Sequence, residues 1–394
     1  MMKINECRSK VSLQSIVPDD GAQYFFGYYD LQPFDQANKR HLAHRVSFLD
    51  RIPEKGDVAE VGYITIEDKV FHKVSQTNAW NFQQGALLQW FDEDHIIFND
   101  FRNGDYCSVI ANVETGEERL LCAPLAHLSA DRKWGLSINF PRVWNFRPGY
   151  GYCNTVDPYF DVNAPEEDGI FLVDVEQNTC KLIMNYKQMA EMFPEKPFCE
   201  MKLVVNHITF NPSASRFLFL LRNFPKPGSR WGTILITADR DGSNAHKLTD
   251  YQINSHYHWK DDRNIMIWSI LPEMGIFFFD DVTGERVLLD DALCNETDIH
   301  CLYAPDRSCF IGDDYPRQDH EFTRAIKCYD CETKRSGIVL ELFSDEKGIT
   351  DIRCDLHNRF SPDGTLVSFD TNYTGRREIL IFPFDKKRFL IDNE

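Results

Sequence analysis

Histidines recur at one position in successive repeats of this sequence, and this recurrence is its clearest sign of a chemical site. Each repeat has a His, a few hydrophobic residues, a turn of Asp, Pro, Ser or Gly, and then an apolar strand. Imidazole serves as a general base or a metal ligand near neutral pH. One such histidine alone is more often a structural hydrogen-bonding group, whereas several at one position indicate a shared site. The residues are His127, His207, His258, His300 and His357, with His256 beside the third of them.

A cysteine and a histidine with C-x-x-H spacing stand in the last repeat. Cys354 and His357 form this pair, and His300 holds the corresponding position one repeat earlier. Thiolate and imidazole together favour zinc or another late first-row metal. Asp355 offers a carboxylate instead, and a carboxylate ligand would favour manganese. The sequence therefore predicts a divalent metal site, with zinc or manganese as the ion.

Arginines and tyrosines near the same repeats offer groups for an acidic ligand. Arg222 ends the segment VNHITFNPSASRFLFLLR, while Arg142, Arg147, Tyr150 and Tyr152 lie within FPRVWNFRPGYGYCN. A guanidinium can hold a carboxylate by two parallel hydrogen bonds, and a tyrosine can stack on a sugar or transfer a proton. The alternative for the tyrosines is a glycine-bounded loop that packs over one face of the protein.

Seven hairpins of one pattern supply the elements that must position these residues. Each is a strand with alternating apolar and polar residues, a tight turn of Asp, Glu, Gly or Asn, and a second strand. Recurrence every roughly 40–65 residues is typical of four-stranded blades around a central channel. The sequence thus predicts an all-β fold, a seven-bladed β-propeller with four-stranded antiparallel blades. The hairpins begin at Gly62, Val109, Phe171, Ile236, Phe278, Lys327 and Leu380.

The innermost strand of each propeller blade lines the central channel. Because the recurring histidines lie near the starts of these strands, we expect a group of them to meet at one mouth of the channel. That group is His207, His256, His258, His300 and His357.

The chain shows no sign of a boundary between domains. We expect residues 1–394 to form a single propeller domain, because no Gly/Ser linker or low-complexity segment divides them. Residues 186–202 predict a short helical insertion before the fourth blade. The segment around Ser12 to Ile16 is expected to add a strand to the last blade, which would close the ring.

The net charge of the protein limits the kinds of partner that it can bind. The formal charge is −18, from 43 Lys and Arg against 61 Asp and Glu. Nucleic acid is not expected as a partner, because its binding relies on a basic face. An acidic oligosaccharide or polysaccharide remains compatible, provided that local arginines overcome the overall field.

The sequence has no run of apolar residues long enough for a signal peptide or a membrane span, so we expect no membrane partner and a cytoplasmic location. In a reducing compartment the 12 cysteines are expected to be free thiols. Cys328 and Cys331 form a CxxC, but Cys331 aligns with Val113 of another repeat. A structural role for this pair is therefore favoured over a redox or zinc role.

Several short segments resemble the seven-bladed polysaccharide lyases, a group that includes oligogalacturonate lyase and the propeller ulvan lyases. These segments are CDLHNRFSPDG, SHYHW, FGYYD, AWNFQQGALLQW and RPGYGY. In oligogalacturonate lyase a metal is held by histidines at the blade starts and by a Q-x-x-H-x-H segment. The resemblance implies His300, Cys354 and His357 as metal ligands, with Cys354 in place of the Gln. Arg359 takes the place of the last His, and we expect it to bind substrate.

The resemblance also implies the catalytic groups. The base becomes His256 or His258, and the arginine beside it becomes Arg222. In the ulvan-type enzymes the metal is structural, while His, Tyr and Arg perform the reaction. Further substrate contacts are expected from Arg142, Arg147 and Tyr152.

The implied reaction is β-elimination at a uronate. It requires that the carboxylate be neutralised, that a base remove the proton α to it, and that the glycosidic oxygen leave. Arg222 or a metal suits the first task, His258 the second, with His207 or His256 as alternatives, and Tyr150 could assist departure. A glycosidase would need two facing carboxylates, and the repeats show no such pair. The other hypothesis is an inert propeller that binds a saccharide or a protein partner.

Overall fold

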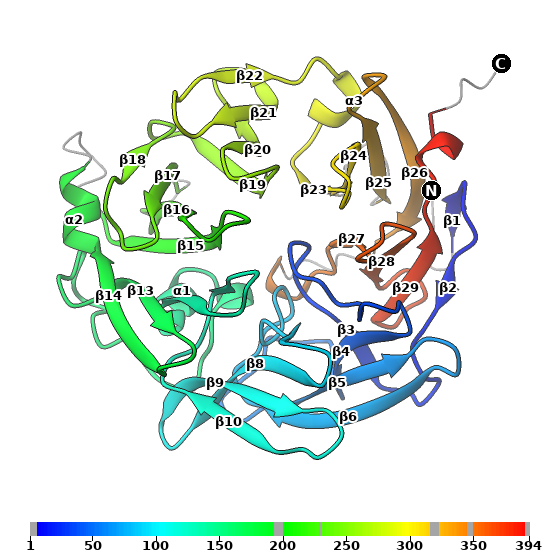
Figure 1. Ribbon diagram of the computed structural model, residues 1–394, viewed down its shortest axis with the longest axis horizontal. Helices are drawn as coiled ribbons and strands as arrows, with labels where there is room; N and C mark the ends of the chain where they lie inside the picture. The colour runs from blue at the N-terminus through cyan, green and yellow to red at the C-terminus, as the bar shows by residue number, and fades with distance from the viewer. Residues whose placement is uncertain (1–5, 193–199, 228–230, 316–322, 345–349, 391–394) are drawn as a thin grey trace.

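The computed structural model describes residues 6–192, 200–227, 231–315, 323–344 and 350–390. In these residues seven antiparallel sheets stand in a ring around a central channel (Figure 1). The predicted seven-bladed β-propeller is confirmed. Each blade has its most exposed strand at the outside of the ring.

The first four blades follow one another along the chain, from the innermost to the outermost strand. Blade 1 contains β3 (Gln23–Phe25), β4 (Arg40–Val46), β5 (Ala59–Thr65) and β6 (Val70–Thr77). Blade 2 contains β7 (Gln89–Trp90), β8 (His95–Arg102), β9 (Asp105–Asn112) and β10 (Glu118–Leu121). Blade 3 contains β11 (His127–Leu128), β12 (Trp134–Ile138), β13 (Gly169–Asp174) and β14 (Thr179–Asn185). Blade 4 contains β15 (Leu203–Phe210), β16 (Arg216–Asn223), β17 (Thr233–Asp239) and β18 (His246–Lys247).

The last three blades complete the ring, and two of them take a strand from the N-terminus. Blade 5 contains β19 (Ile253–Trp259), β20 (Asn264–Ile270), β21 (Met274–Asp280) and β22 (Arg286–Leu288). Blade 6 contains β23 (Ile299–Tyr303), β24 (Cys309–Asp314), β25 (Thr323–Asp330), β26 (Arg335–Phe343) and the fifth strand β1 (Cys7–Ser9). Blade 7 contains β27 (Arg359–Phe360), β28 (Leu366–Thr371), β29 (Glu378–Pro383) and β2 (Gln14–Ser15).

Burial along the strands follows from their place in a blade. The second and third strands pack against neighbouring blades on both faces, so β16 is buried at every residue but the first. The outer strands β10 and β22 are mostly exposed. Continuous buried runs therefore mark middle strands such as β16, and exposed residues mark the outer strands.

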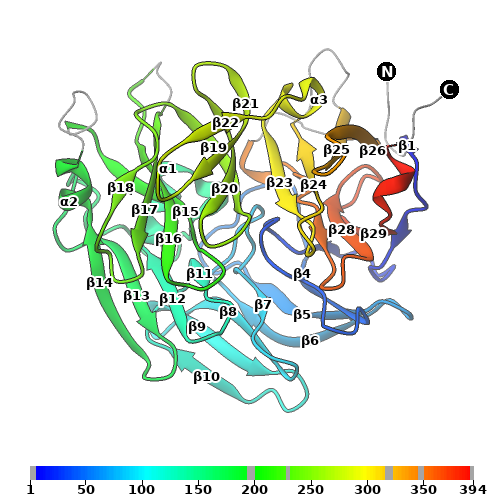
Figure 2. The same cartoon turned by 45° about the horizontal axis from the view of Figure 1, so that its top comes forward.

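The N-terminus closes the ring. Ser15 pairs with Leu380 across β2 and β29, which confirms the strand expected near Ser12 to Ile16. The seventh predicted hairpin is wrong in its second half. After β29 the chain forms the short helix η5 (Lys386–Arg388), because β2 already occupies the outer edge of blade 7. Figure 1 shows β1 and β2 beside β26 and β29, and Figure 2 shows β1 beside β26.

Short helices lie between some of the strands. Within the predicted insertion at 186–202, α2 (Tyr186–Glu191) starts with Asn185 as its cap, and residues 193–199 lie outside the described part. The helices α1 (Phe140–Phe146) and η1 (Pro148–Tyr150) lie between β12 and β13. The others are α3 (Ala292–Asn295) and η4 (Thr350–Ile352). Among the described residues, no helix has the length and apolar character needed to cross a membrane.

A segment of blade 1 enters the channel and touches blades 5 and 7. We call residues 26–31, which follow β3, the channel segment. Tyr29 in this segment donates from its hydroxyl to the carbonyl of Tyr257 in blade 5 (2.7 Å). The carbonyl of Gly27 accepts from the Arg359 guanidinium in blade 7 (2.7 Å). These contacts fix the channel segment beside the innermost strands of several blades.

Candidate functional site

Four histidines from consecutive blades meet at the channel. Ring centroids are 6.1 Å apart for His207 and His256, 3.9 Å for His256 and His300, and 4.5 Å for His300 and His357. These residues come from blades 4, 5, 6 and 7. The structure therefore brings together four of the five histidines expected at the channel mouth.

Local irregularities turn these side chains toward the channel. The pairing of β15 with β16 shifts around His207, and the pairing of β19 with β20 shifts around His256. A bulge interrupts the alternation of a strand and redirects a side chain. His207 and His357 also have positive φ angles, of 55° and 44°. Such backbone is costly outside glycine and is often found at functional sites.

Two of the predicted histidines lie elsewhere. The His258 ring is 5.9 Å from that of Tyr303 in blade 6, and His127 accepts from the backbone N–H of Phe210 (3.2 Å). In a regular strand His256 and His258 would point to the same face. The bulge at His256 separates them, so that His256 rather than His258 joins the cluster.

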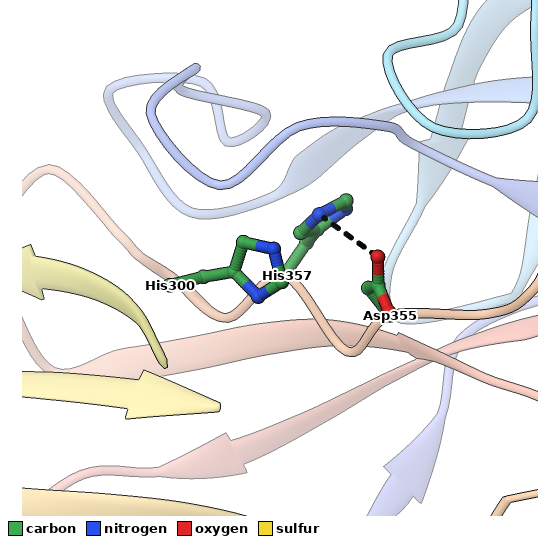
Figure 3. A group of neighbouring side chains, drawn as sticks. All are labelled: His300, Asp355 and His357. Carbon is green, nitrogen blue, oxygen red and sulfur yellow. Dashed lines mark ion pairs between the residues drawn. The ribbon is translucent and has the colours of Figure 1, made fainter. Parts of the chain in front are cut away.

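His300, His357 and Asp355 form a group that could hold a metal ion (Figure 3), because their ligand atoms all lie within 4.8 Å of one another. Nδ1 of His300 faces Asp313 (3.2 Å), and Nδ1 of His357 faces the carbonyl of Gly27 (2.9 Å). These bonds place the lone pairs on the two Nε2 atoms, which have no hydrogen-bond partner among the described residues.

Asp355 is also the centre of an ion-pair network. It lies 2.7 Å from Arg324 and 2.7 Å from Arg353, and all three side chains are almost completely buried. Burial alone would raise the pKa of Asp355, but the two guanidiniums hold it well below its usual value. The carboxylate is therefore ionised, as a metal ligand must be.

Cys354 does not belong to this group. Its sulfur points toward the carbonyl of Asp355 (3.9 Å), and burial raises the pKa of the thiol to about 12. A protonated thiol is a poor metal ligand. The structure thus favours the carboxylate of Asp355 over the thiol as the third donor beside His300 and His357.

Tyr28, which the sequence analysis did not single out, stands at the middle of the cluster. Its hydroxyl is 3.2 Å from Nε2 of His207, and the two rings stack with centroids 4.9 Å apart. Burial raises the pKa of Tyr28 well above its usual value and lowers that of His207 well below its own. Both groups are therefore neutral, and the tyrosine O–H can donate to the imidazole.

Tyr150 reaches the same place from η1. Its ring centroid is 5.4 Å from that of His207, and its hydroxyl oxygen accepts from Arg353 (2.9 Å). The tight turn of RPGYGY makes this possible, because a Cβ at Gly151 would lie 2.1 Å from the backbone nitrogen of Trp144. Glycine at this position lets η1 pack against α1 and directs Tyr150 to the channel.

Arg222 is a buried cation without a carboxylate partner among the described residues. Its guanidinium donates to the side chain of Asn206 (2.7 Å) and to the carbonyl of Asn254, while its Nε has no partner. Burial, followed by the charge of nearby Arg147, lowers the pKa of Arg222 to about 10. An anion placed beside Arg222 would relieve this cost.

The other predicted contacts of a substrate serve the framework. Arg142 is fully buried against Asp157 (3.1 Å) and three backbone segments. Arg359 pairs with Asp370 (3.1 Å), and Tyr152 accepts from the side chain of Asn99 (3.1 Å). All three have relative exposures of 1% or less. Arg147 alone of this predicted set is half-buried, with its guanidinium 4.5 Å from the Tyr150 ring.

His256 has a carboxylate as its partner. Its Nδ1 is 2.9 Å from Asp298, whose side chain is partly exposed. Burial lowers the pKa of His256 to about 4, although Asp298 opposes this shift. The sequence analysis did not identify Asp298 and Asp355 as partners of the site histidines. Each of them lies two residues before a histidine of the site. The repeated D-x-H in DIH and DLH was the signal that could have found them.

A narrow cavity adjoins the cluster. Its lining includes Tyr28, Tyr150, Asn206, His207 and Asp30 of the channel segment. Burial raises the pKa of Asp30 to about 7. The cavity therefore combines neutral proton-carrying groups with the buried cation of Arg222 nearby.

The fold and the cluster define a seven-bladed propeller with a histidine-rich channel site. Two solved structures share this fold over nearly their whole length. Oligogalacturonate lyase from Vibrio parahaemolyticus matches with 14% identity and a TM-score of 0.67, over 97% of this chain and 98% of that one. An oligogalacturonate lyase in complex with manganese matches with 14% identity and a TM-score of 0.69, over 98% and 100%.

Other propellers are less similar. TolB from Acinetobacter baumannii has 13% identity and a TM-score of 0.43, over 88% of this chain and 80% of that one. No protein-family model matches the sequence, and no curated protein matches it either. The comparisons thus establish the propeller fold alone.

Proposed function

We propose that this protein is a lyase that cleaves an acidic, uronate-containing glycan by β-elimination at the channel mouth. The observation that carries the proposal is the buried guanidinium of Arg222. It has no carboxylate partner among the described residues and lies close to the Tyr28–His207 pair. An unpaired buried cation beside a neutral acid–base pair suits a substrate that brings its own carboxylate.

The site supplies a residue for each step of the reaction. Arg222 neutralises the substrate carboxylate, and Arg147 adds a second positive charge at the mouth. The oxygen of Tyr28 accepts the proton α to the carboxylate as its own proton passes to Nε2 of His207. The electrons of the broken C–H bond form the C=C bond, and the C–O bond β to the carboxylate breaks.

The leaving oxygen takes a proton from Tyr150. The oxygen of Tyr150 accepts from Arg353, so its own O–H remains available to donate. The products are a 4,5-unsaturated uronate end and a free hydroxyl, and His207 and Tyr150 return to their neutral forms by exchange with water.

The metal site fits a divalent cation. His300, His357 and Asp355 would hold it, with water or substrate in the remaining positions, and carboxylate and imidazole ligands are compatible with manganese. A bound cation would add positive charge next to the substrate carboxylate.

A screen of uronate oligosaccharides tests the function. Formation of the unsaturated product is followed by its ultraviolet absorbance. We expect His207→Gln to lower turnover by roughly 10²–10⁴. His258→Gln, which changes a histidine outside the cluster, is the matched control and should retain turnover. Equal losses in both variants, or no product from any uronate with the parent protein, would refute the lyase assignment.

The second candidate is a propeller that binds an acidic saccharide without cleaving it. The observation in its favour is that Asp355 is already paired with two arginines, which weakens it as a metal ligand. Binding measured by calorimetry without product formation would support this candidate.

A further inference from the structure

A strip of aromatic and cationic side chains leads away from the channel mouth. Next to Tyr150, the guanidinium of Arg147 lies 4.5 Å from the Tyr150 ring and 5.8 Å from the ring of Trp231. Trp231 in turn packs edge-on against Phe146, with centroids 5.4 Å apart. Contact is therefore continuous from the site to an exposed tryptophan.

The strip continues outward without a gap. The rings of Phe146 and Phe224 are 5.3 Å apart. The ammonium of Lys202 lies 5.3 Å from the Phe224 ring and 3.5 Å from that of Phe160. We call this set the outer strip. It consists of Phe146, Arg147, Phe160, Lys202, Phe224 and Trp231.

The fold places the outer strip at one end of blade 4. Lys202 immediately precedes β15, Phe224 immediately follows β16, and Trp231 lies just before β17. Since neighbouring strands of a blade are antiparallel, these positions share one edge, and α1 carries Phe146 to the same edge. The relative exposures of Trp231 and Phe160 are 38% and 46%. The strip thus presents aromatic rings to solvent.

The two cations of the strip are not used by the framework. Neither Arg147 nor Lys202 has an ion pair among the described residues. The charges of Asp161 and Asp157 act on the Lys202 ammonium, and Asp157 is held by Arg142. On a protein with a net charge of −18, two such cations between aromatic rings stand out. Aromatic faces with fixed positive charges between them are complementary to a chain of acidic sugars.

We propose that the outer strip binds the additional sugar units of an acidic oligosaccharide whose reacting unit lies at the channel mouth. Trp231 and Phe160 stack on sugar rings, and Arg147 and Lys202 meet the carboxylates. This inference rests on the proposed function, because it takes the channel mouth as the site of the reacting unit. It extends that function by assigning a preference for long substrates.

Calorimetry with oligogalacturonates of two and of six units tests the strip. We expect Trp231→Ala and Lys202→Ala each to weaken binding of the longer probe by about tenfold, the loss of one ring or charge contact. Binding of the shorter probe should not change. Lys181→Ala and Val287→Ala, at exposed positions of other outer strands, are the matched controls and should leave both affinities unchanged.

The outcomes test the outer strip and the lyase function separately. Equal weakening of both probes, or no weakening of the longer one, would overturn the strip even if turnover is measured. Length-dependent weakening without any product would support the strip and refute the lyase. Unfolding curves of the variants must match the parent for either result to count, and Lys202→Arg, which keeps the charge, should restore most of the affinity.

Discussion

Arg142 and Arg222 show how differently this protein uses two buried guanidiniums. Arg142 is saturated, with Asp157 and several carbonyls around it. Arg222 has amide and carbonyl oxygens on two nitrogens and nothing on the third. Both are buried, and both stand in sequences that suggest substrate binding. What distinguishes them is whether the fold satisfies the charge or leaves it for a ligand.

The histidines divide in the same way. His246, in the outermost strand of blade 4, has a partner at both ring nitrogens, with Nε2 2.8 Å from the carbonyl of Asp281 and Nδ1 3.4 Å from that of Asn244. His300 and His357 have one ring nitrogen fixed by the framework and the other without a hydrogen-bond partner among the described residues. The two channel histidines thus keep a bonding capacity that His246 has used.

The largest effect that tests this contrast is on stability. We expect Arg142→Met to lower the free energy of unfolding by about 3–5 kcal/mol, because it leaves Asp157 buried without its cation. Arg222→Met should change it by less than about 1 kcal/mol or raise it, since no carboxylate loses a partner. Urea denaturation measures both. Similar losses of stability in the two variants would contradict the proposed difference between Arg142 and Arg222.

Turnover should respond in the opposite way. Arg222→Met is expected to lower kcat by roughly 10²–10³, the effect of losing one electrostatic donor in an active site. Arg222→Lys keeps the charge but not the two-pronged geometry, so it should recover only part of the loss. Steady-state kinetics on a uronate oligosaccharide gives the numbers. An unchanged kcat in Arg222→Met would show that the substrate carboxylate binds away from Arg222.

Metal binding sharpens the comparison of the histidines. Manganese at a hundredfold excess over its Kd should stabilise the parent protein by about 2.7 kcal/mol, because it binds the folded state. His357→Ala should abolish the stabilisation, and His258→Ala should keep it, since His258 lies outside the cluster. Denaturation with added manganese, and with chelator, provides the test. A stabilisation that survives His357→Ala would place the ion at another site.

The smallest expected effect is the pH dependence from the framework histidines. Burial lowers the pKa of His44 to about 3, so the folded state binds fewer protons than the unfolded state below pH 6.5. Stability is therefore complete above that pH and falls as the pH falls, by up to about 1.4 kcal/mol per pH unit for each such histidine. His44→Gln should reduce this slope between pH 6.5 and 5. An unchanged slope in chemical denaturation would mean that His44 is not held neutral by burial.

Much of the fold followed from local patterns. Apolar alternation and acidic or glycine turns determined six of the seven outer hairpins, and the need to close the ring indicated a strand near Ser15. The seventh hairpin failed because its outer strand is β2, from the other end of the chain. Local propensity cannot show which distant segment fills a sheet edge.

The site was only half predictable for a related reason. The recurrence of histidines identified His207, His300 and His357, whose positions follow from the repeat. It could not choose His256 over His258, because a bulge in β19 decided between them. Nor could it tell that Arg359 pairs with Asp370 inside the framework while Arg222 stays unpaired.

By itself, the sequence determined the repeat, the strands and the kinds of side chain at their starts, since these depend on periodicity and turn chemistry between near neighbours. The tertiary structure alone decided that Tyr28 of the channel segment meets His207 of blade 4, nearly half the chain away. It also decided that Asp355, and not Cys354, faces the two imidazoles. Contacts across a closed ring depend on the path of the whole backbone, so no local pattern encodes them.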